Sequence, residues 1–494
     1  MELRVKEVYI GAGGKNVAVL NYADASELDV RPLEKVKISF RGKEAIAIVD
    51  ISERVVERGE IGLFLETLEA LGAKEMDIVE VVPCERLAST FYIRKKLEGR
   101  ELKEDEVMEI VRDIVGNRLS EIEIAYFVAA TFTKKMSLKE TYFLTKAIVE
   151  TGKRLKLNKY PILSKHSIGG ICGNRISLII VPTIASLGYT IPKTASKAIT
   201  SPSGTADTME VLANVSFGID ELKEIIEKVN ACIVWGGSLD IAPADDKIIR
   251  IENPLMLDPR AQMSASILAK HIGVGTTHLI LDLPTGREAK LKSYASARKF
   301  LSDLKWIGKK FNLKLDGVIT RAREPIGNGI GPALEARDCL LILENRLRGN
   351  LREKAKLVGC RLLNLVGVEL RRAQEMFERS IEKGKALKKF REIIEAQGGD
   401  PNIRPEDIEI GGYTYDVKAR KRGKISHLDD NSIAILARLA GSPKDKGAGV
   451  YLHKHLGEKV KKGDKILTIY AESERKLTEA IRFLRKEKRI VVIR

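Results

Sequence analysis

The sequence predicts a multidomain protein of mixed α/β and α+β class, and three features of the chain support this prediction. The chain has 494 residues, 44% of them hydrophobic, which is enough to bury several cores. Short runs of alternating apolar and polar residues, typical of strands, dominate both ends. Between them, strand-like apolar runs alternate with helical patterns, which favours a largely parallel sheet. We expect a β-rich N-terminal domain, a helical domain, a central α/β domain and a C-terminal α+β domain.

The first two domains are expected at residues 1–83 and 84–158. In the first, alternating runs are separated by glycine and aspartate turns, which is typical of a small β-rich domain. In the second, Ile110, Ile114 and Val115 keep the three-and-four spacing that places one apolar stripe on a helix. Residues 84–158 are therefore predicted to form a helical bundle.

The central α/β domain is expected at residues 159–410. Its strand-like apolar runs stand at residues 177–187, 231–234, 277–283 and 315–320. The first of these runs begins with a helix-prone segment, residues 176–180. In an open parallel sheet, the loops after the carboxyl ends of the strands form the binding site. We therefore expect the chemistry of the protein in those loops.

Residues 411–494 return to strand-rich patterning. Gly457 and Gly463 punctuate a stretch that resembles the hammerhead barrels of biotinyl and lipoyl carriers. Those carriers attach their cofactor to a lysine in a tight Met-Lys-Met-like turn, which this stretch lacks. We therefore expect a hammerhead-like α+β domain that serves as a structural module.

A strong positive charge indicates anionic ligands. The net charge is +17 and the pI is near 9.4, so the electrostatic field of the protein attracts anions. Nucleic acid, acidic surfaces and phosphorylated metabolites are the candidates, and the sign of the charge does not choose among them. Aromatic residues make up only 5% of the chain, and no segment interleaves them with basic residues as a base-stacking surface would. We expect small anionic substrates and no nucleic-acid partner.

The sequence contains no pattern typical of a membrane segment or a metal site. No apolar run approaches the roughly 18 residues that a membrane span needs, so we expect a cytoplasmic protein without membrane contact. The five cysteines lie far apart, and the six histidines include one close pair, His453 and His455. We expect neither a disulfide framework nor a bound metal.

The most informative motif is Lys-His-Ser-Ile-Gly-Gly at residues 165–170. Glycines let backbone N–H groups approach an anion, the N-terminus of a following helix adds its dipole, and Lys165 adds a point charge. The motif therefore predicts a phosphate cradle. A glycine-rich turn with an exposed lysine is the plainer alternative.

A second polar segment, residues 195–210, strengthens this interpretation. Five hydroxyls fall within ten of its residues, and each can donate to a phosphate oxygen or a ribose hydroxyl. Gly204 removes steric bulk, and Asp207 is suited to cap the helix that follows. The alternative is a Ser/Thr-rich loop that hydrogen-bonds only to itself.

Together these motifs resemble the family that contains thymidine phosphorylase, pyrimidine-nucleoside phosphorylase and archaeal AMP phosphorylase. The similarity includes residues 92–99, both polar motifs and residues 264–270, so it covers about residues 85–494. The AMP phosphorylase branch is most similar. Its members also have an extra N-terminal domain and the sequence Lys-Ala-Ile-Thr-Ser, which stands here at residues 197–201. The resemblance implies phosphorolysis of AMP by orthophosphate without a cofactor, with CMP and UMP as further candidates.

The resemblance also implies roles for individual residues. The residues implied to hold the attacking phosphate are Lys165, Ser167, Ser177 and Thr205. The residues implied to border the nucleotide are Gly170, Ser196, Lys197, Ala198, Ile199, Thr200, Ser201, Thr205 and Ser266. His166 is expected to orient phosphate or ribose. Lys270 falls on a lysine that contacts the base in the pyrimidine enzymes, and its role here stays open.

Departures from the pyrimidine enzymes affect two parts of the site. Those enzymes read serine where Ala195 stands, so this hydroxyl has either moved to Ser196 or been lost from the phosphate site. Where they have an uncharged loop, this chain has Arg287 and Lys290. A 5′-phosphate needs such cations because its charge cannot be desolvated unpaired, and Lys290 is the natural partner. A solvated surface turn is the alternative.

Cleavage of the bond between adenine and ribose requires neutralisation of the departing base. The reaction passes through an oxocarbenium-like state, and a proton from a carboxylic acid makes adenine a better leaving group. In the resembling AMP phosphorylases, an aspartate at the place of Asp258 is the proton donor. By itself, Asp258 before Pro259 is also typical of a turn. The acid needs a raised pKa, which burial would favour and Arg260 would oppose.

The sequence leaves three other functions open. A pyrimidine-nucleoside phosphorylase would prefer uridine or thymidine to AMP. A phosphoribosyltransferase shares the architecture and needs magnesium-bound pyrophosphate. A nucleic-acid-binding protein that reuses the fold fits the charge but not the aromatic content. The family resemblance also implies a homodimer or a larger homo-oligomer, with the N-terminal domain serving oligomerisation.

Overall fold

The computed structural model describes residues 1–198, 201–255, 257–487 and 489–494. The described chain divides into two compact units. Unit 1 comprises Met1–Thr151 and Ala244–Met263, and unit 2 comprises Gly152–Pro243 and Ser264–Arg494. Among the described residues, no helix combines the length and the apolar character that a membrane span requires.

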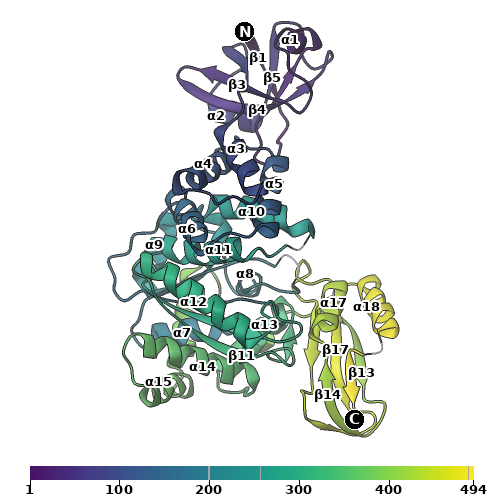
Figure 1. Cartoon of the computed structure of the whole chain (residues 1–494). Coiled ribbons are helices and arrows are strands. Elements are labelled where there is room, and N and C mark those ends of the chain that lie inside the picture. The colour runs from purple at the N-terminus through teal and green to yellow at the C-terminus, as the bar shows by residue number, and fades with distance from the viewer. Residues whose placement is uncertain (199–200, 256, 488) are drawn as a thin grey trace. The chain divides into compact units, whose positions relative to one another are not determined.

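Unit 1 begins with a closed β-barrel (Figure 1). Its strands are β1 (Glu2–Val8), β2 (Val17–Leu20), β3 (Lys35–Phe40), β4 (Lys43–Ile51), β5 (Glu60–Phe64) and β6 (Ile78–Pro83), in the order β1-β5-β2-β4-β3-β6. Val36, Ile38 and Phe40 of β3 alternate with partly exposed residues and are buried, as expected for a strand with one face on the core. The short helices of this part are α1 (Tyr22–Glu27) and α2 (Leu65–Leu71).

The rest of unit 1 is helical. Its elements are α3 (Ala88–Leu97), α4 (Glu104–Val115), α5 (Glu121–Thr133), α6 (Leu138–Thr151), most of α10 (Pro243–Glu252) and η2 (Asn253–Leu255). Ile110 and Ile114 of the apolar stripe on α4 are buried. Lys96 of α3 and Glu140 of α6 form a buried ion pair, with 2.7 Å between the nitrogen and the oxygen. Packing of apolar faces and this ion pair therefore hold the bundle together.

A parallel sheet lies at the centre of unit 2. It contains β11 (Lys314–Arg321), β10 (His278–Thr285) and β7 (Leu163–Ser167) in that order. β8 (Ile191–Ala195) and β9 (Ala231–Trp235) form a second parallel pair, and a parallel bridge between Ile162 and Thr190 continues the first sheet toward it. The prediction of a largely parallel central sheet is confirmed.

Helices surround these strands. They are α7 (Ser177–Ser186), α8 (Thr205–Met209), α9 (Ile219–Val229), α11 (Arg260–Gly273), α12 (Tyr294–Lys310), α13 (Pro332–Leu343), α14 (Asn350–Leu365), α15 (Leu370–Glu382) and α16 (Lys385–Ala396), with the 3-10 turns η1 (Gly236–Ser238) and η3 (Pro405–Asp407). α11 starts in unit 1 and continues into unit 2 at Ser264. Figure 1 shows α12 and α14 among the helices that flank the strands of unit 2.

The strand-like run predicted at residues 177–187 is wrong, because this segment forms the helix α7. Every residue of α7 from Ser177 to Ala185 is buried. α7 packs against α14, α16, β8 and β9. A helix enclosed by core is apolar on all sides, so its sequence lacks the 3.6-residue period and resembles a buried strand.

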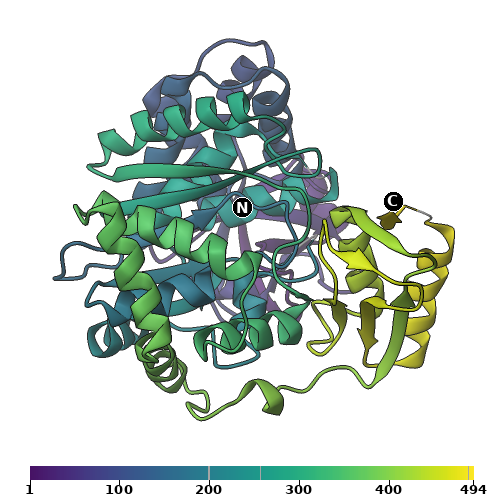
Figure 2. The same cartoon turned by 90° about the horizontal axis from the view of Figure 1, so that it is seen from below.

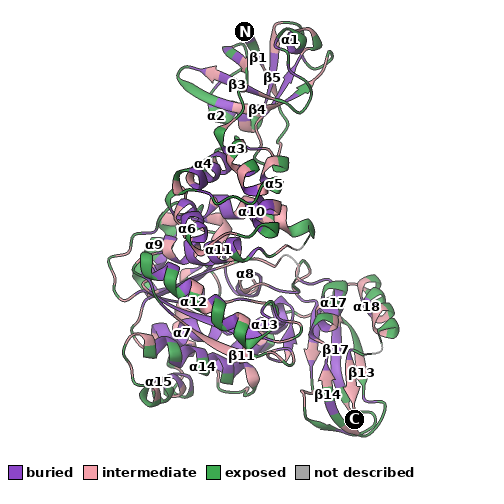
Figure 3. Cartoon of the chain, viewed as in Figure 1, coloured by how far each residue is buried: buried purple, intermediate pink, exposed green. Residues whose placement is uncertain are grey.

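The C-terminal part of unit 2 contains two antiparallel sheets and two helices among its described residues. The elements are β12 (Gly329–Ile330), β15 (Gly449–Leu452), β17 (Lys465–Ala471) and β13 (Tyr413–Lys418) in one sheet, β16 (Lys459–Val460), β14 (Gly423–Leu428) and β18 (Val491–Ile493) in the other, and α17 (Asp430–Ala440) and α18 (Glu474–Lys486). β17 is mostly buried (Figure 3). Gly457 and Gly463 adopt φ angles of 92° and 94° in the turns beside β16, which favour glycine.

This C-terminal part is connected to the α/β part by more than the linking segment. β12 precedes α13 in the chain, yet it pairs with β15 of the C-terminal sheet. Figure 2 shows the yellow C-terminal sheets and helices beside the green helices, with a long connection between them. The predicted class of mixed α/β and α+β architecture is therefore confirmed.

Candidate active site

The motifs assigned to the site follow parallel strands of unit 2. β7, β8 and β10 run in the same direction, so their carboxyl ends share one edge. The loop after β7 covers residues 168–176, the loop after β8 covers residues 196–204, and the loop after β10 covers residues 286–291. The polar motifs and the cationic loop of the sequence therefore lie at the edge where an α/β sheet usually binds its ligand.

Lys165 and Ser177 meet between β7 and α7. Both side chains are buried, and the Lys165 Nζ donates to the Ser177 Oγ over 3.2 Å. Ser177 is the first residue of α7, and the preceding N-cap residue, Ile176, supplies no capping side chain. The N–H groups of Leu178 and Ile179 already donate to the carbonyls of Arg175 and Ile176, so what α7 offers an anion at this point is the Ser177 hydroxyl and the positive end of the helix dipole.

Asp282 of β10 is the acceptor that organises this region. Its Oδ2 accepts hydrogen bonds from the Ser167 Oγ at 2.7 Å and from the Asn174 Nδ2 at 2.9 Å. The same oxygen lies 3.0 Å from the Lys354 Nζ of α14. The Asp282 side chain is 0% exposed and the Lys354 side chain is 8% exposed. One buried carboxylate therefore fixes a residue of β7, a residue of the following loop and a cation of α14.

The charges of this region are unbalanced. Burial lowers the pKa of the Lys165 ammonium well below its ordinary value, while nearby Asp282 opposes this effect and Lys193 and Lys354 strengthen it. Burial also lowers the pKa of Lys193 to about 8. Burial alone would raise the pKa of Asp282, yet Lys354 and Lys165 hold it below its ordinary value. An incoming anion would compensate the buried positive charge.

His166 pairs with a second histidine that the sequence analysis did not identify. Its Nδ1 lies 3.2 Å from the Nε2 of His271 on α11, and the rings meet edge to face. Burial, together with the neighbouring lysines, lowers the pKa of both imidazoles well below the ordinary value, so both are neutral. The His271 Nδ1 is buried without a partner among the described groups.

The pairing indicates the tautomer of His166. A buried N–H without an acceptor is rarer than a buried lone pair without a donor, so the His271 Nδ1 carries no proton. The His271 Nε2–H then donates to the His166 Nδ1, and the proton of His166 lies on its Nε2. His166 is therefore a neutral hydrogen-bond donor.

The loop after β8 is partly held by its own groups. Asp207 of α8 accepts from the backbone N–H groups of Ala198 and Gly204, which confirms its predicted capping role. The Ser201 Oγ donates to the Ser203 carbonyl at 3.0 Å, as the alternative of a self-bonded loop predicts. Thr205 is the first residue of α8. Ile199 and Thr200, which were assigned to the nucleotide, lie outside the described residues.

Lys197 and Ser196 differ in their surroundings. The Lys197 Nζ donates to Glu210 at 2.6 Å and lies 5.2 Å from the centre of the Trp235 ring. Lys446 donates to the other oxygen of Glu210 at 2.5 Å. Ser196 is exposed. In this structure Lys197 is therefore engaged by Glu210 and Trp235.

Gly170 brings the first and third loops together. Its φ angle is +89°, and a Cβ at this position would lie 2.9 Å from the backbone nitrogen of Lys290. Only glycine therefore allows the two loops to approach this closely. Gly170 and the exposed Lys290, both assigned to the nucleotide, are neighbours.

Arg175 links the loops to α13. Its guanidinium bonds to the Glu335 carboxylate of α13 and to the carbonyl of Ser203. The Thr208 Oγ1 donates to the same carboxylate at 2.9 Å. The sequence analysis missed this contact because Arg175 and Glu335 lie 160 residues apart in the chain.

Ser266, Lys270 and Asp258 come from the segment around α11. Ser266 and Lys270 lie in the part of α11 that belongs to unit 2, and both are partly exposed. Asp258 precedes α11, belongs to unit 1 and is exposed there. Burial among apolar neighbours, which the sequence analysis considered as a cause of a raised pKa, is therefore not present at Asp258.

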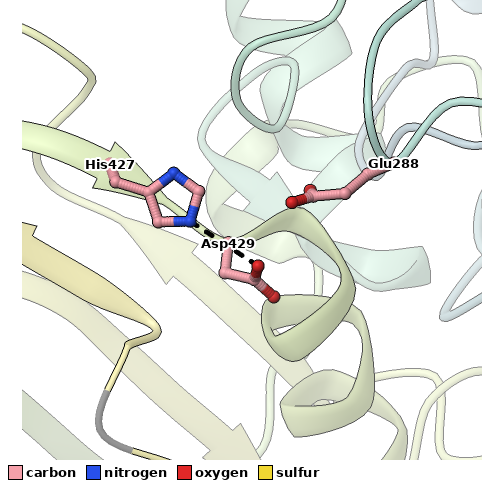
Figure 4. Close-up of side chains that lie close together, drawn as sticks. All are labelled: Glu288, His427 and Asp429. Atoms are coloured by element: carbon pink, nitrogen blue, oxygen red, sulfur yellow. Dashed lines mark ion pairs between the residues drawn. The ribbon is translucent and has the colours of Figure 1, made fainter. Parts of the chain in front are cut away.

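Among the described residues, one group of three side chains could hold a metal ion: Glu288, His427 and Asp429, whose ligand atoms lie within 4.8 Å of one another (Figure 4). Contacts within the chain already account for these groups. Asp429 caps α17 by accepting from the Ser432 N–H, and its Oδ2 lies 3.6 Å from the His427 Nε2. Glu288 accepts from the N–H of Asp430 at 2.9 Å. We assign them the role of fastening the loop after β10 to α17.

The histidine pair of the sequence has separate partners. The His453 Nε2 lies 2.8 Å from the Thr468 Oγ1. The His455 ring contacts Glu324 at 3.1 Å and Asn328 at 2.8 Å. The two imidazoles therefore serve different packing contacts.

Comparison with known proteins places the chain among glycosyl transferases. Models described as "Glycosyl transferase family, helical bundle domain", "Glycosyl transferase family, a/b domain" and "Pyrimidine nucleoside phosphorylase C-terminal domain" match residues 91–152, 159–250 and 424–491. An anthranilate phosphoribosyltransferase from Thermus thermophilus has a similar fold, with a TM-score of 0.51 and 15% identity over 62% of this chain and 99% of that chain. The fold and the matched domains define an enzyme of the pentosyl-transferring class of glycosyl transferases.

Relatives of nearly full length narrow the assignment. AMP phosphorylase from Thermofilum pendens is 48% identical over 96% of this chain and 92% of its own length. AMP phosphorylase 1 from Archaeoglobus fulgidus is 45% identical over 97% of this chain and 95% of its own. AMP phosphorylase from Pyrococcus furiosus is 43% identical over 98% of this chain and 97% of its own length. The chain belongs to the AMP phosphorylase family, which confirms the family predicted from the motifs.

Replacing Asp282 by asparagine is expected to destabilise unit 2 by about 3–5 kcal/mol, because Lys354 and Lys165 would be left buried without a counter-charge. The measurement is urea unfolding of the purified variant. Asp316→Asn is the matched control. The Asp316 side chain is 45% exposed and that of its partner Lys305 is 46% exposed, so this ion pair should contribute about 0–1 kcal/mol to stability. Equal losses in the two variants would contradict the proposed role of Asp282.

The effect of Asp282→Asn should also depend on pH. Because the folded pKa of Asp282 lies below its ordinary value, its stabilising contribution is present above the ordinary aspartate pKa. This contribution is lost as pH falls through the folded pKa. The difference in unfolding free energy between the wild type and the variant should therefore shrink in acid.

Proposed function

We propose that the protein cleaves the N-glycosidic bond of AMP with orthophosphate and releases adenine and ribose 1,5-bisphosphate. CMP and UMP are further substrates in this proposal. The observation that carries it is the buried contact between Lys165 and Ser177 at the N-terminus of α7. The names of the relatives support the choice of AMP.

The phosphate subsite of this proposal uses Lys165, Ser167, Ser177 and Thr205. Burial makes the charged form of Lys165 costly in the empty site. A phosphate anion next to Lys165 would raise its pKa again, so binding favours the charged ammonium. Ser167 would donate to phosphate only by giving up its bond to Asp282, or accept from a protonated phosphate while keeping it.

In the proposed reaction, a phosphate oxygen forms a bond to C1′ while the bond from C1′ to the base nitrogen breaks. The electron pair of the broken bond leaves with the base, and the sugar passes through an oxocarbenium-like state. No covalent bond to the enzyme forms, because orthophosphate itself is the nucleophile. His166, as a neutral Nε2–H donor, would orient a phosphate or ribose oxygen.

Asp258 is the proposed proton donor to the departing adenine. Protonation of the base neutralises the charge that develops on it as the bond breaks. Asp258 is exposed in this structure, so its carboxyl group is open to contact with a departing base. Solvent would then return the proton to the carboxylate after adenine leaves.

The 5′-phosphate is the group that would distinguish a nucleotide from a nucleoside. Lys290 lies next to Gly170 in the loop after β10, and its side chain is exposed. Gly170 borders the loop that begins with the phosphate motif. A cation at this place could pair with the 5′-phosphate of a ribose held at that loop.

We further propose that the enzyme needs no cofactor and acts as a homo-oligomer. The bond-forming group is supplied by orthophosphate, so the reaction requires no additional electrophile or redox group. Ile122 and Tyr126 lie one turn apart on α5 and are 66% and 56% exposed, and Phe91 of α3 is 46% exposed. Exposed apolar side chains on these helices support self-association through unit 1.

The assay that tests the proposal mixes the protein with AMP and orthophosphate and detects free adenine by chromatography. Adenine release that depends on both reactants is expected. Uridine and thymidine are the controls for the alternative of a pyrimidine-nucleoside phosphorylase, and we expect AMP to be cleaved faster than either. Cleavage of uridine without cleavage of AMP would refute the proposal.

Asp258→Asn is expected to lower kcat about 100-fold or more, because the departing adenine would lose its proton donor. AMP binding should be retained, as measured by titration calorimetry without phosphate. Asp105→Asn is the matched control, since Asp105 is an exposed aspartate of α4 in the same unit. An unchanged kcat in Asp258→Asn would remove this residue from the mechanism.

Lys290→Gln is expected to raise the KM for AMP by about 10-fold or more, because a charge-assisted contact with the 5′-phosphate would be lost. The measured quantity is the ratio of the kcat/KM values for AMP and adenosine. Lys309→Gln, which removes an exposed lysine of α12 outside this loop, provides the comparison. A ratio that falls equally in both variants would show a general charge effect rather than a specific contact.

A further inference from the structure

A cavity of about 580 Å³ opens at the carboxyl ends of β10 and β11. It is lined by Thr285, Gly286, Lys292, Ser293, Tyr294, Ile319, Thr320, Arg321, Ala322 and Arg323. All of these residues belong to unit 2. The volume falls within the range of about 300–1,000 Å³ that is usual for small-molecule sites.

The charged residues of this lining are all cations: Lys292, Arg321 and Arg323. Neither guanidinium has an ion-pair or side-chain hydrogen-bond partner in the part of the chain that the structure describes. A second cavity, of about 660 Å³ in unit 1, has a mixed lining, in which two cations are accompanied by three glutamates. The cavity at β10 and β11 therefore favours an anion, and the one in unit 1 does not.

Other groups of the lining suit a phosphorylated ligand. α12, a helix of 17 residues, begins at Tyr294 and directs its N-terminal end to the cavity wall. Thr320 and Ser293 add hydroxyls that can donate to phosphate oxygens. Tyr294 is 64% exposed, so a planar base could stack on its ring. The combination offers charge for several phosphate groups and one aromatic face.

This cavity is separate from the proposed phosphate subsite. Lys165 and Ser177 lie on β7 and α7, whereas the cavity lies at β10 and β11, and the sheet order is β11-β10-β7. No residue assigned to phosphate or nucleotide lines the cavity. An anion held there would occupy a second site.

The loop after β10 connects the two places. Thr285 bridges to Leu291 at the base of the loop, and Gly286 and Lys292 line the cavity. The Lys292 Nζ donates to the carbonyl of Arg287 within the loop at 3.0 Å. A polyanion in the cavity would attract Lys292 away from this carbonyl, and the loop carries Lys290 next to Gly170.

We propose that this cavity binds a second ligand with at least two linked phosphate groups, and that its occupancy changes the affinity for AMP through Lys292 and residues 286–291. Recognition rests on Arg321, Arg323 and Lys292, which pair with the phosphate groups. The effect on AMP rests on the proposed function, whereas binding to the cavity does not. The ligand chemistry is shared by pyrophosphate and the polyphosphate chain of a nucleotide.

The binding experiment uses titration calorimetry of the full chain with pyrophosphate. The wild type is expected to bind it at the cavity and at the subsite of Lys165. Arg321→Ala/Arg323→Ala should lose one of these sites, with affinity there reduced about 10-fold or more. Arg298→Ala/Lys309→Ala, which removes two exposed cations of α12 outside the cavity, should leave both sites intact. Unchanged pyrophosphate binding in Arg321→Ala/Arg323→Ala would overturn the proposal.

Lys165→Met separates this proposal from the proposed function. It is expected to lose the other pyrophosphate site and to keep the cavity site. If Lys165→Met keeps both sites while Arg321→Ala/Arg323→Ala loses one, the phosphate role of Lys165 fails and the cavity proposal stands. Melting temperatures of all variants establish that each chain is folded.

A second titration, with ATP, identifies the source of the phosphate groups. Tighter binding of ATP than of pyrophosphate, lost in Tyr294→Ala, assigns the site to a nucleotide. Equal affinities that do not change in Tyr294→Ala assign it to the phosphate groups alone. Tighter binding of a short single-stranded RNA than of ATP would identify a nucleic-acid surface and overturn the proposal.

The coupling is measured as the KM for AMP at saturating orthophosphate, with and without pyrophosphate. We expect pyrophosphate to change this KM about threefold or more in the wild type and not in Arg321→Ala/Arg323→Ala. Rates without pyrophosphate should be equal in the two proteins, because neither arginine belongs to the proposed catalytic machinery. An unchanged KM in a wild type that binds pyrophosphate at the cavity would overturn the coupling.

Discussion

The buried ion pair between Asp282 of β10 and Lys354 of α14 is the contact on which the candidate site depends. Removing both charges from water is costly, and the cost is met only when the carboxylate is also hydrogen-bonded. Ser167 and Asn174 provide those bonds. The same carboxylate thereby fixes the end of β7 and the loop after it. The positions of Lys165 and Ser177 follow from this arrangement.

The surroundings of Asp282 contain more buried cations than anions. Lys165, Lys193 and Lys354 are all buried. Burial, together with Lys165, Lys193 and Lys270, keeps the two nearby histidines neutral. Such an excess costs folding free energy in the empty protein. Uptake of an anion, as in the proposed function, would offset this cost because the ligand would supply the missing negative charge.

The position of the polar loops could be predicted from sequence because it depends on local composition. Glycine and hydroxyl residues next to a lysine favour anion binding, and the motif at residues 165–170 was selected on this ground. Asp282 could also have been noticed, as a single acid within the apolar strand β10. Lys354 and Glu335 could not, because their meaning comes from partners far away in the chain, Asp282 and Arg175.

The fold could be predicted where hydrophobic periodicity is visible and not where burial is complete. The alternating strands of the barrel and the apolar stripe on α4 have a clear period, and both were assigned correctly. α7 has no period because the core surrounds it, so its sequence was read as a strand. The exposure of Asp258 could also not be predicted from sequence, because it depends on tertiary structure rather than on local composition.

The loop at residues 286–291 gives the C-terminal part of unit 2 a role in the site. Glu288 accepts from the N–H of Asp430 at the start of α17, and Asp430 in turn accepts from the N–H of Cys172 in the loop after β7. The loops after β7 and β10 are therefore both fastened to α17, and Gly170 lets them approach each other on the other side. Burial raises the pKa of Asp430 to about 7, so this junction is held by an acid that is easily kept neutral. The C-terminal part of unit 2 thus supports the loop that carries Lys290.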